Sequence, residues 1–274
     1  MKFNYEEYKK NLIKNELSEK TVRKYLRDVK KYFDFCSLKK IDSDCFDSMI
    51  KYKEYLKGNY RSTSVNSYLI SLNRYLKWLD QYDLRVSLIK CQRKYFTSSE
   101  LSVEDYRTML NFAYSGSNTK WYLIMRCLGS MGIRIGELRF ITYEAVLSGN
   151  AEILFKSKLR TILIPYRLQS ELLDFCRRCG ICAGTVFMNK NGTAPLDSSV
   201  IWRNLKKIAG SAGIDNSRVY PHNFRHMFAR VYMDEFHDIA ELADILGHSS
   251  IETTRLYTKS SRETQLVRLD ILDL

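Results

Sequence analysis

Residues 19–37 read EKTVRKYLRDVKKYFDFCS, and this stretch decides how the first third of the chain folds. Its apolar residues recur at three- and four-residue steps, which places them on one face of an α-helix. These apolar residues are Val22, Tyr25, Leu26, Val29, Tyr32 and Phe33. The basic residues on and beside the opposite face are Lys20, Arg23, Lys24, Arg27, Lys30 and Lys31. With Ser18 available as an N-cap, the pattern predicts a helix that buries its apolar face and presents a basic one.

Helical periodicity extends to both sides of this stretch. It predicts further helices over 3–15, 44–57 and 63–82. Four helices with short connections are typical of a compact bundle. Residues 85–99 then lack a clean period and carry several basic residues, so we interpret them as a linker suited to a phosphate backbone.

After residue 100 the helical pattern returns around a small β-like region. The runs 152–155 and 161–164 predict a hairpin with a basic tip, and 185–188 predicts a third strand. The helices predicted here are 103–114, 119–130, 168–179, 197–210, 222–233, 237–245 and 250–257. Only 3 Pro and 12 Gly interrupt the chain, which favours helix throughout. The predicted fold is mainly α: a helical bundle (1–84), a basic linker (85–99) and an α-rich domain with a small β-sheet edge (100–274).

The charge balance indicates a polyanionic partner. The formal net charge is +13, and residues 1–100 alone hold 22 basic and 13 acidic residues. Such an excess favours nucleic acid or an acidic membrane surface. The opening MKFNYEEYKK lacks the apolar core of a signal peptide, and no run approaches 18 apolar residues. We therefore expect a cytoplasmic protein that does not enter a membrane.

The cysteines do not indicate a disulfide framework, since there are seven and no export signal. Cys176, Cys179 and Cys182 recur at three-residue intervals, which would place them on roughly one face of a helix. That spacing suits a metal, but a fourth ligand is missing nearby. We expect reduced, partly buried cysteines and no metal site.

Phosphodiester transfer without a metal requires a particular set of side chains. It needs a nucleophile such as Tyr, guanidinium groups for the charge on the non-bridging oxygens, and groups that move protons at the attacking and leaving oxygens. The sequence provides such a set in three segments. They are MGIRIGELRF (131–140) with Arg134, YPHNFRHMFA (220–229) with His222 and Arg225, and LADILGHSSIETTRLYT (242–258) with His248 and Tyr257.

These segments closely resemble the tyrosine recombinase, or phage integrase, family. Its Arg box with Gly-Glu-Leu is matched at Arg134, its His-x-x-Arg box at His222 and Arg225, its Leu-Gly-His at His248, and its nucleophile at Tyr257. The resemblance implies a SAM-like core-binding domain followed by a catalytic domain that forms a 3′-phosphotyrosyl link without metal or ATP. It also implies double-stranded DNA as substrate, a homotetramer on DNA, accessory directionality or DNA-bending proteins, and association with the nucleoid.

The family's catalytic lysine lies at the turn of a β-hairpin, where it donates a proton to the departing 5′ oxygen. In this chain both Lys156 and Lys158 occupy such a turn. The resemblance favours Lys156, although Ser157 replaces the usual Gly. The alternative, that both lysines are solvated and touch phosphates, stays open.

Each of the matched residues also has a simpler interpretation. Arg134 and Glu137 could form a surface ion pair, His222 could begin a helix after Pro221, and His248 could lie in a turn. Tyr257 is one of 19 tyrosines. His226 is interpreted as structural, and His237 as a surface or capping residue. The apolar tail residues Leu266, Leu269, Ile271, Leu272 and Leu274 could dock on a neighbouring protomer or on their own domain.

Two other functions remain open on the sequence. One is a DNA-binding protein that has kept the fold without catalysis. The other is a type IB topoisomerase, which shares the tyrosine chemistry. The full set of candidate residues argues against the first, and the short chain with a separate bundle domain argues against the second.

Overall fold

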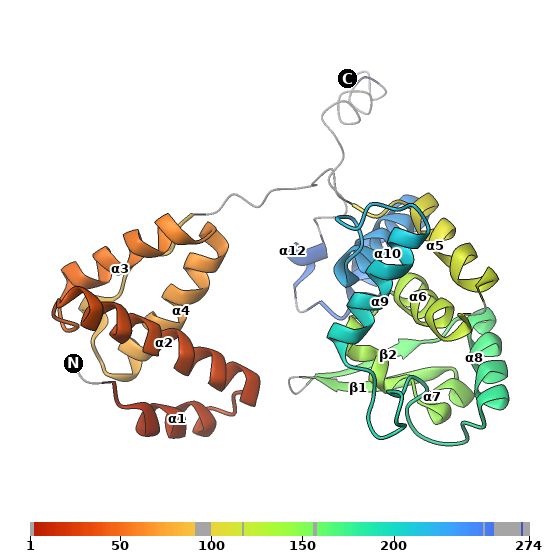
Figure 1. Cartoon of the computed structure of the whole chain (residues 1–274), viewed down its shortest axis with the longest axis horizontal. Coiled ribbons are helices and arrows are strands. Elements are labelled where there is room, and N and C mark those ends of the chain that lie inside the picture. Colours follow the sequence, from red (N-terminus) through yellow and green to blue (C-terminus); the bar gives the residue numbers. More distant parts are fainter. Residues whose placement is uncertain are drawn as a thin grey trace. The chain divides into compact units, whose positions relative to one another are not determined.

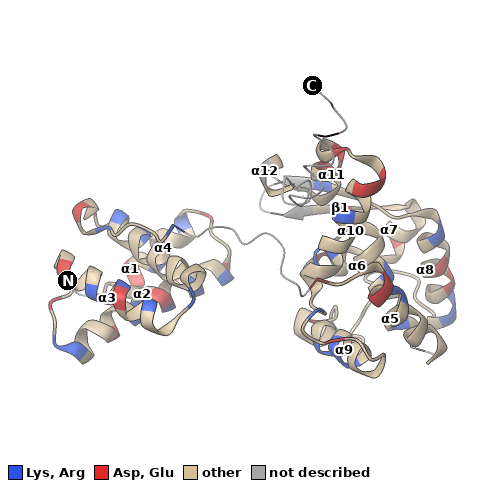
Figure 2. Cartoon of the chain, turned by 90° about the horizontal axis from the view of Figure 1, so that it is seen from above, with Lys and Arg blue, Asp and Glu red and all other residues tan. Residues whose placement is uncertain are grey.

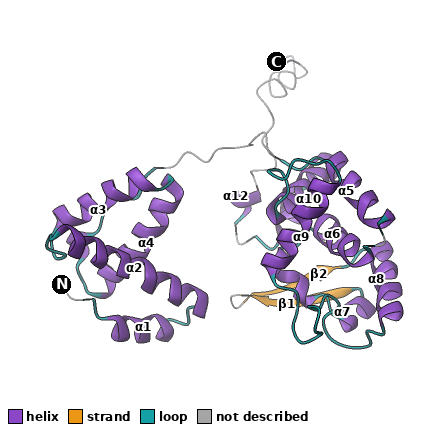
Figure 3. Ribbon diagram, viewed as in Figure 1, coloured by secondary structure: helices purple, strands orange, loops and turns teal. Residues whose placement is uncertain are grey.

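The computed structural model describes residues 3–90, 100–116, 118–155, 158–248, 250–254 and 270, without the side chains of 154, 155, 158, 159 and 252. The chain divides into two compact units, unit 1 (Met1–Lys94) and unit 2 (Tyr95–Leu274) (Figure 1). Most of the described residues are helical, and the described strands form a single pair (Figure 3). The predicted mainly α fold with a small sheet is confirmed.

Unit 1 is a bundle of α1 (Tyr5–Lys14), α2 (Glu19–Lys39), α3 (Phe46–Asn59) and α4 (Ser62–Trp78). The apolar face predicted for the second helix is its buried face, since Val22, Leu26, Val29 and Tyr32 are each at most 4 % exposed. The Ser18 hydroxyl accepts a hydrogen bond from the first turn, as predicted. Helix α2 packs against the other three helices, which explains why its periodicity is so complete.

The end of the bundle differs from the sequence prediction. The fourth helix ends at Trp78, and Tyr82–Leu84 form a short 3₁₀ turn. Residues 85–90 then run along α4, because the Asn73 amide bonds both backbone groups of Val86 and the Asn66 amide bonds both of Ile89. The first six residues of the predicted linker therefore pack on unit 1. The rest of it, 91–99, lies outside the described residues, and the division into 1–84, 85–99 and 100–274 stays a prediction.

Unit 2 consists of helices around a core of its own. Its helices are α5 (Val103–Ser115), α6 (Thr119–Met131), α7 (Tyr143–Ser148), α8 (Tyr166–Cys179), α9 (Ser198–Ser211), α10 (Pro221–Phe236), α11 (Ile239–Leu246) and α12 (Ile251–Thr254), with a 3₁₀ helix at Ile135–Phe140. Helix α6 contacts α5, α8 and α10 and is almost fully buried along one face. Residue His237 ends α10 in a left-handed conformation and Asp238 caps α11, so the capping role predicted for His237 is confirmed.

The sheet is one antiparallel hairpin of β1 (Asn150–Phe155) and β2 (Lys158–Leu163). Its inward face carries Ala151, Ile153 and Ile162, which are at most 3 % exposed. The third strand predicted at 185–188 is wrong, because Thr185 and Met188 make only isolated bridges, to Thr142 and Pro195. Each bridge pairs a single residue, so no ladder forms there.

The cysteine spacing does not produce a common helix face. Helix α8 ends at Cys179, and Gly180 turns the chain in a left-handed conformation before Cys182 is reached. Cys176 is buried, whereas Cys179 and Cys182 are exposed. The described parts of the chain contain no group of three or more His, Cys, Asp or Glu side chains placed to hold a metal ion. None of the helices in those parts is long and apolar enough to cross a membrane.

Candidate active site

Arg134 is held in place by a buried carboxylate. It follows the left-handed turn at Gly132 and caps the 3₁₀ helix Ile135–Phe140. Glu137 accepts hydrogen bonds from the Arg134 backbone N–H (2.8 Å) and from its Nη1 (2.9 Å). The Glu137 side chain is only 7 % exposed, against 37 % for Arg134. The pair is therefore more than a surface ion pair: a buried acid orients a guanidinium whose outer side reaches solvent.

Arg225 connects three segments of unit 2. This residue is 3 % exposed and lies in α10. Its Nη1 donates to the Gly132 carbonyl (2.8 Å), and its Nη2 donates to the Leu246 carbonyl (2.6 Å) and contacts His248 Nε2 (2.9 Å). Arg225 thus joins the end of α6, where the Arg134 segment begins, to the end of α11, where His248 lies.

The contacts of His248 define its protonation state. A guanidinium can only donate, so Nε2 accepts from Arg225 and the ring proton is on Nδ1, facing the Thr254 hydroxyl at 2.7 Å. Desolvation first, then the charges of Arg225 and Arg134, lower the His248 pKa to about 4. The ring is therefore a neutral imidazole at neutral pH. It lies in the turn after Gly247.

His222 and His226 lie one turn apart at the start of α10, with ring centroids separated by 6.0 Å. Although His222 reaches solvent, desolvation by its surroundings and the charges of Arg225 and Arg134 lower its pKa. Burial and the neighbouring His222 and Arg225 lower the His226 pKa to about 4. The charges of Arg134 and Arg225 act on both His222 and His248, and that of Arg225 also acts on His226. Because Arg225 also contacts His248 directly, Arg134, His222, Arg225 and His248 lie in one basic region.

Three predicted residues are not placed. Tyr257, Lys156 and the side chain of Lys158 lie outside the described residues, as does the apolar tail from Leu266 to Leu269 and from Ile271 to Leu274. Their roles stay predictions. Sequence reasoning missed Arg160, which binds the same carboxylate as Arg134. The period of two does place Arg160 on the face of β2 that buries Ile162, but it does not identify the partners of Arg160.

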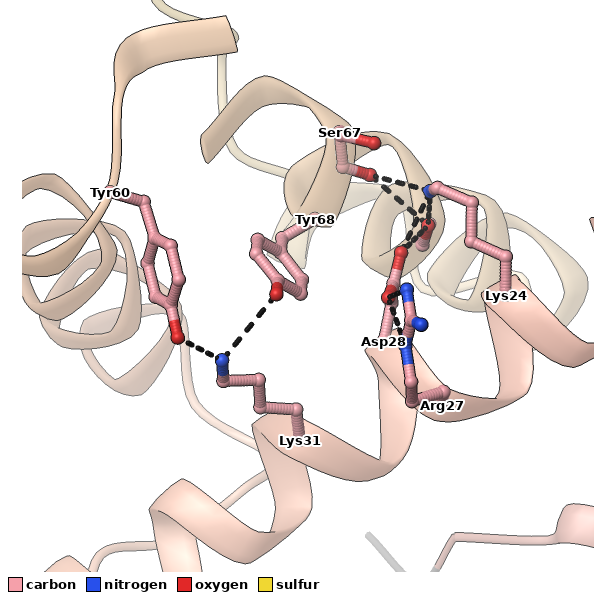
Figure 4. A network of polar contacts seen from close by, with 8 residues as sticks. Lys24, Arg27, Asp28, Lys31, Tyr60, Ser67 and Tyr68 are labelled. Atoms are coloured by element: carbon pink, nitrogen blue, oxygen red, sulfur yellow. Dashed lines mark hydrogen bonds and ion pairs between the residues drawn. The ribbon is translucent and has the colours of Figure 1, made fainter. Parts of the chain in front are cut away.

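In unit 1 the basic face of α2 is organised by a buried acid (Figure 4). Asp28 has a side chain 1 % exposed and accepts from Lys24 (2.7 Å), Arg27 (3.2 Å) and the Ser71 hydroxyl of α4 (2.9 Å). Lys31 lies against the rings of Tyr60 and Tyr68, with its ammonium 4.3 and 4.7 Å from their centroids.

Basic residues are spread over the helices of both units (Figure 2). Lys24 and Lys31 are half-buried and tie α2 to its neighbours, whereas the other predicted basic residues of α2 are exposed. The exposed ones are Lys20, Arg23, Arg27 and Lys30. These exposed basic residues make the face positive, and positive charge favours contact with a phosphate backbone.

Comparison with known proteins assigns both units. Residues 99–264 match the model of the phage integrase family, and residues 5–83 match that of the phage integrase N-terminal SAM-like domain. The chain belongs to the phage integrase family. The predicted class, a tyrosine-type site-specific recombinase with a SAM-like N-terminal domain, is confirmed.

Curated relatives of this integrase-family chain agree with that class. It is 25 % identical to TnP I resolvase of Bacillus thuringiensis, with 93 % of this chain and 94 % of the relative covered. It is 28 % identical to tyrosine recombinase XerD of Staphylococcus saprophyticus, with 94 % of each covered.

Solved structures share the integrase fold at lower identity. The XerH recombinase bound to its difH substrate has a TM-score of 0.70 and 18 % identity, covering 92 % of this chain and 79 % of that one. A lambda integrase tetramer bound to a Holliday junction has a TM-score of 0.69 and 16 % identity, covering 93 % and 77 %. At this identity they show the likeness of fold alone.

The depressed histidine pKa values predict an acid-labile fold. Between pH 6.5 and about 4, His226 and His248 are protonated in the unfolded chain but not in the folded chain. The free energy of unfolding should therefore fall as the pH falls. Above pH 6.5 this contribution should be constant. Urea unfolding from pH 4.5 to 7.5 measures the slope. His226→Gln should flatten it, and His237→Asn, at the exposed cap of α10, should leave it unchanged.

Proposed function

We propose that this chain cleaves and rejoins double-stranded DNA at a specific site through a 3′-phosphotyrosyl intermediate on Tyr257. The observation that carries the proposal is the pair of anchored guanidiniums. Arg225 is buried and fixed by two carbonyls, and Arg134 is fixed by Glu137 while its outer side stays accessible. Prearranged cations of this kind stabilise the charge that develops on a phosphate during transfer.

The proposed reaction exchanges one phosphoester for another. The Tyr257 oxygen attacks phosphorus, the bond to the 5′ oxygen breaks, and a 3′-phosphotyrosine and a free 5′-hydroxyl result. His222 accepts the tyrosine proton, while Lys156 donates one to the leaving oxygen. A 5′-hydroxyl of the partner strand then reverses the step. Because each step conserves the number of phosphoester bonds, ATP is not required, and the two guanidiniums supply the charge stabilisation that a metal would otherwise give.

His248 changes its bonding in this scheme. In the structure its Nε2 accepts from Arg225, so it has no proton there to give to a phosphate. A phosphate bound beside the two guanidiniums adds negative charge near the ring and favours its protonated form. We propose that the imidazole then donates from Nε2 to a non-bridging oxygen.

The proposed partner is duplex DNA, with a homotetramer assembled on two sites. A lambda integrase of similar fold forms a tetramer on a Holliday junction, which supports this assembly. The net charge of +9 in residues 1–100 favours DNA binding by unit 1. The decisive experiment selects a bound duplex from a random-sequence library, places a nick within it, and looks for a protein–DNA adduct that survives denaturation. Binding without any adduct would contradict the proposed chemistry.

The two hairpin lysines should differ in their effect on the leaving oxygen. Lys156→Ala should slow adduct formation by about 10²- to 10⁴-fold, the usual worth of a general acid. Lys158→Ala should act mainly through DNA affinity. A nicked substrate whose 5′-bridging oxygen is replaced by sulfur should rescue Lys156→Ala, because a thiolate leaves without protonation. Rescue of Lys158→Ala instead would exchange the two roles.

A further inference from the structure

Arg160 occupies a position where its neighbours are apolar. It stands opposite Ile153 in the hairpin, on the face that buries Ala151 and Ile162, and its side chain is only 11 % exposed. A charge in such a place is costly unless its N–H groups and its charge are met by partners. Its Nε is buried without a hydrogen-bond partner among the described residues, so the cost is only partly offset. The partners that it does have indicate why an arginine lies there.

The first partner is the carboxylate that orients Arg134. The Nη1 of Arg160 donates to both oxygens of Glu137 at 3.1 Å. The same carboxylate accepts from the backbone and side chain of Arg134. Since Glu137 is 5 % exposed, the two guanidiniums share one desolvated acid. Without Arg160 the Glu137 carboxylate would lose two of the hydrogen bonds that fix it beside Arg134.

The second partner is the end of α11. The Nη2 of Arg160 donates to the Ile245 carbonyl, and Arg225 binds the next carbonyl, that of Leu246. Carbonyls in the last turn of a helix lack partners within the helix and favour cations. Arg160 and Arg225 therefore hold two consecutive carbonyls immediately before the turn that carries His248.

The backbone of that turn also packs closely against the Arg160 side chain. Gly247 has a φ of +61°, and a Cβ added there would lie 2.4 Å from Arg160 Cδ and 2.8 Å from its Nε. A glycine is thus needed both for the left-handed conformation and for this close approach. The aliphatic part of the Arg160 side chain therefore packs against the turn at Gly247, one residue before His248.

We propose that Arg160 is a positioning residue that fixes the β-hairpin to the Arg134 segment and to the His248 turn. Its effect on catalysis rests on the proposed function, whereas its effect on the turn concerns the DNA-free protein alone. A guanidinium can make both attachments because its two Nη groups point in fixed, different directions. A lysine keeps the charge but presents one ammonium on a flexible stem, so it should hold Glu137 or the Ile245 carbonyl and not both.

The test compares Arg160→Lys with Arg126→Lys. Arg126 makes a partly buried ion pair with Glu171 between α6 and α8, at 3.4 Å. It makes no hydrogen bond or ion pair with those candidate catalytic residues that the structure describes. Arg160→Lys should slow adduct formation on the nicked duplex by about 10- to 100-fold, the usual cost of losing a group that orients a reacting side chain. Its DNA dissociation constant should stay within about twofold, since the side chain is almost fully covered. Arg126→Lys should lose stability without losing rate.

A second readout uses the DNA-free protein. The ring ¹⁵N resonances of His248, assigned by comparison with His248→Gln, should move in Arg160→Lys, while those of His237 should not. Because lysine keeps the charge, such a change reports movement of the turn. If Arg160→Lys destabilises the fold too far, Arg160→Met, which keeps most of the apolar stem, tests the rate of adduct formation alone, because it also removes a charge that acts on the His248 ring.

The outcomes separate the two proposals. Unchanged His248 resonances, or moved resonances with a wild-type rate, would each overturn the positioning role of Arg160. If the wild-type protein forms no adduct, the proposed chemistry fails, and the His248 resonances alone decide whether Arg160 fixes the turn.

Discussion

Tyr257→Phe should abolish the covalent protein–DNA adduct while leaving DNA binding close to wild type. The substitution removes one oxygen, the atom that would attack phosphorus, and keeps the ring. Without a nucleophile no phosphoester can form on the protein, so the rate of adduct formation should fall by at least about 10⁴-fold. Denaturing gel electrophoresis of the labelled nicked duplex measures the adduct, and a mobility shift measures binding.

The matched control is Tyr166→Phe. Tyr166 begins α8 and is 90 % exposed, so removing its hydroxyl should not disturb the fold. This variant should form adduct at the wild-type rate. An adduct that persists in Tyr257→Phe would show that another residue is the nucleophile, and mass spectrometry of the DNA-linked peptide would identify it.

Arg225→Lys should reduce adduct formation by about 10³-fold or more and should also destabilise unit 2. The arginine reaches the Gly132 and Leu246 carbonyls and His248 with two Nη groups, and one ammonium cannot reach all three. The carbonyls left without a donor are buried, so the loss in the free energy of unfolding should be roughly 2 kcal/mol. Single-turnover cleavage and urea unfolding measure the two effects.

The control for Arg225 lies on the same helix. Arg230 is ion-paired with Glu100 at 2.7 Å, and its side chain is 36 % exposed. Arg230→Lys should therefore cost little stability and should keep the cleavage rate. A wild-type rate in Arg225→Lys would contradict the proposed phosphate-stabilising role, whatever its effect on stability.

The local sequence pattern was sufficient to predict the helices but not the residues at which they end. The stripe from Val22 to Tyr32 gave α2 because a helix that packs on three neighbours must be apolar along one face. The strand prediction at 185–188 was wrong, because a short β-like stretch does not reveal whether a partner strand exists. At Trp78 the helix ends earlier than its periodicity suggests, since Leu79 and Leu84 remain apolar for packing and not for helix formation.

The candidate site shows the same division. The boxes around Arg134, His222, Arg225 and His248 could be recognised because they lie within short segments of fixed spacing, and the structure places these four residues in one basic region. The burial of Glu137 and the role of Arg160 could not be recognised in that way. Their contacts join residues 23 and 85 positions apart, and the Arg225–Gly132 bond spans 93.

The sequence alone determined the mainly α class, the apolar and basic faces of α2, and the family to which the chain belongs. These follow from periodicity and from spacing within segments, both of which are local. Only the tertiary structure decided which acid is buried beneath Arg134, which nitrogen of His248 carries the proton, and that one arginine of the hairpin reaches both segments. Hydrogen-bond partners and desolvation depend on which distant segments meet, and no local pattern encodes that meeting.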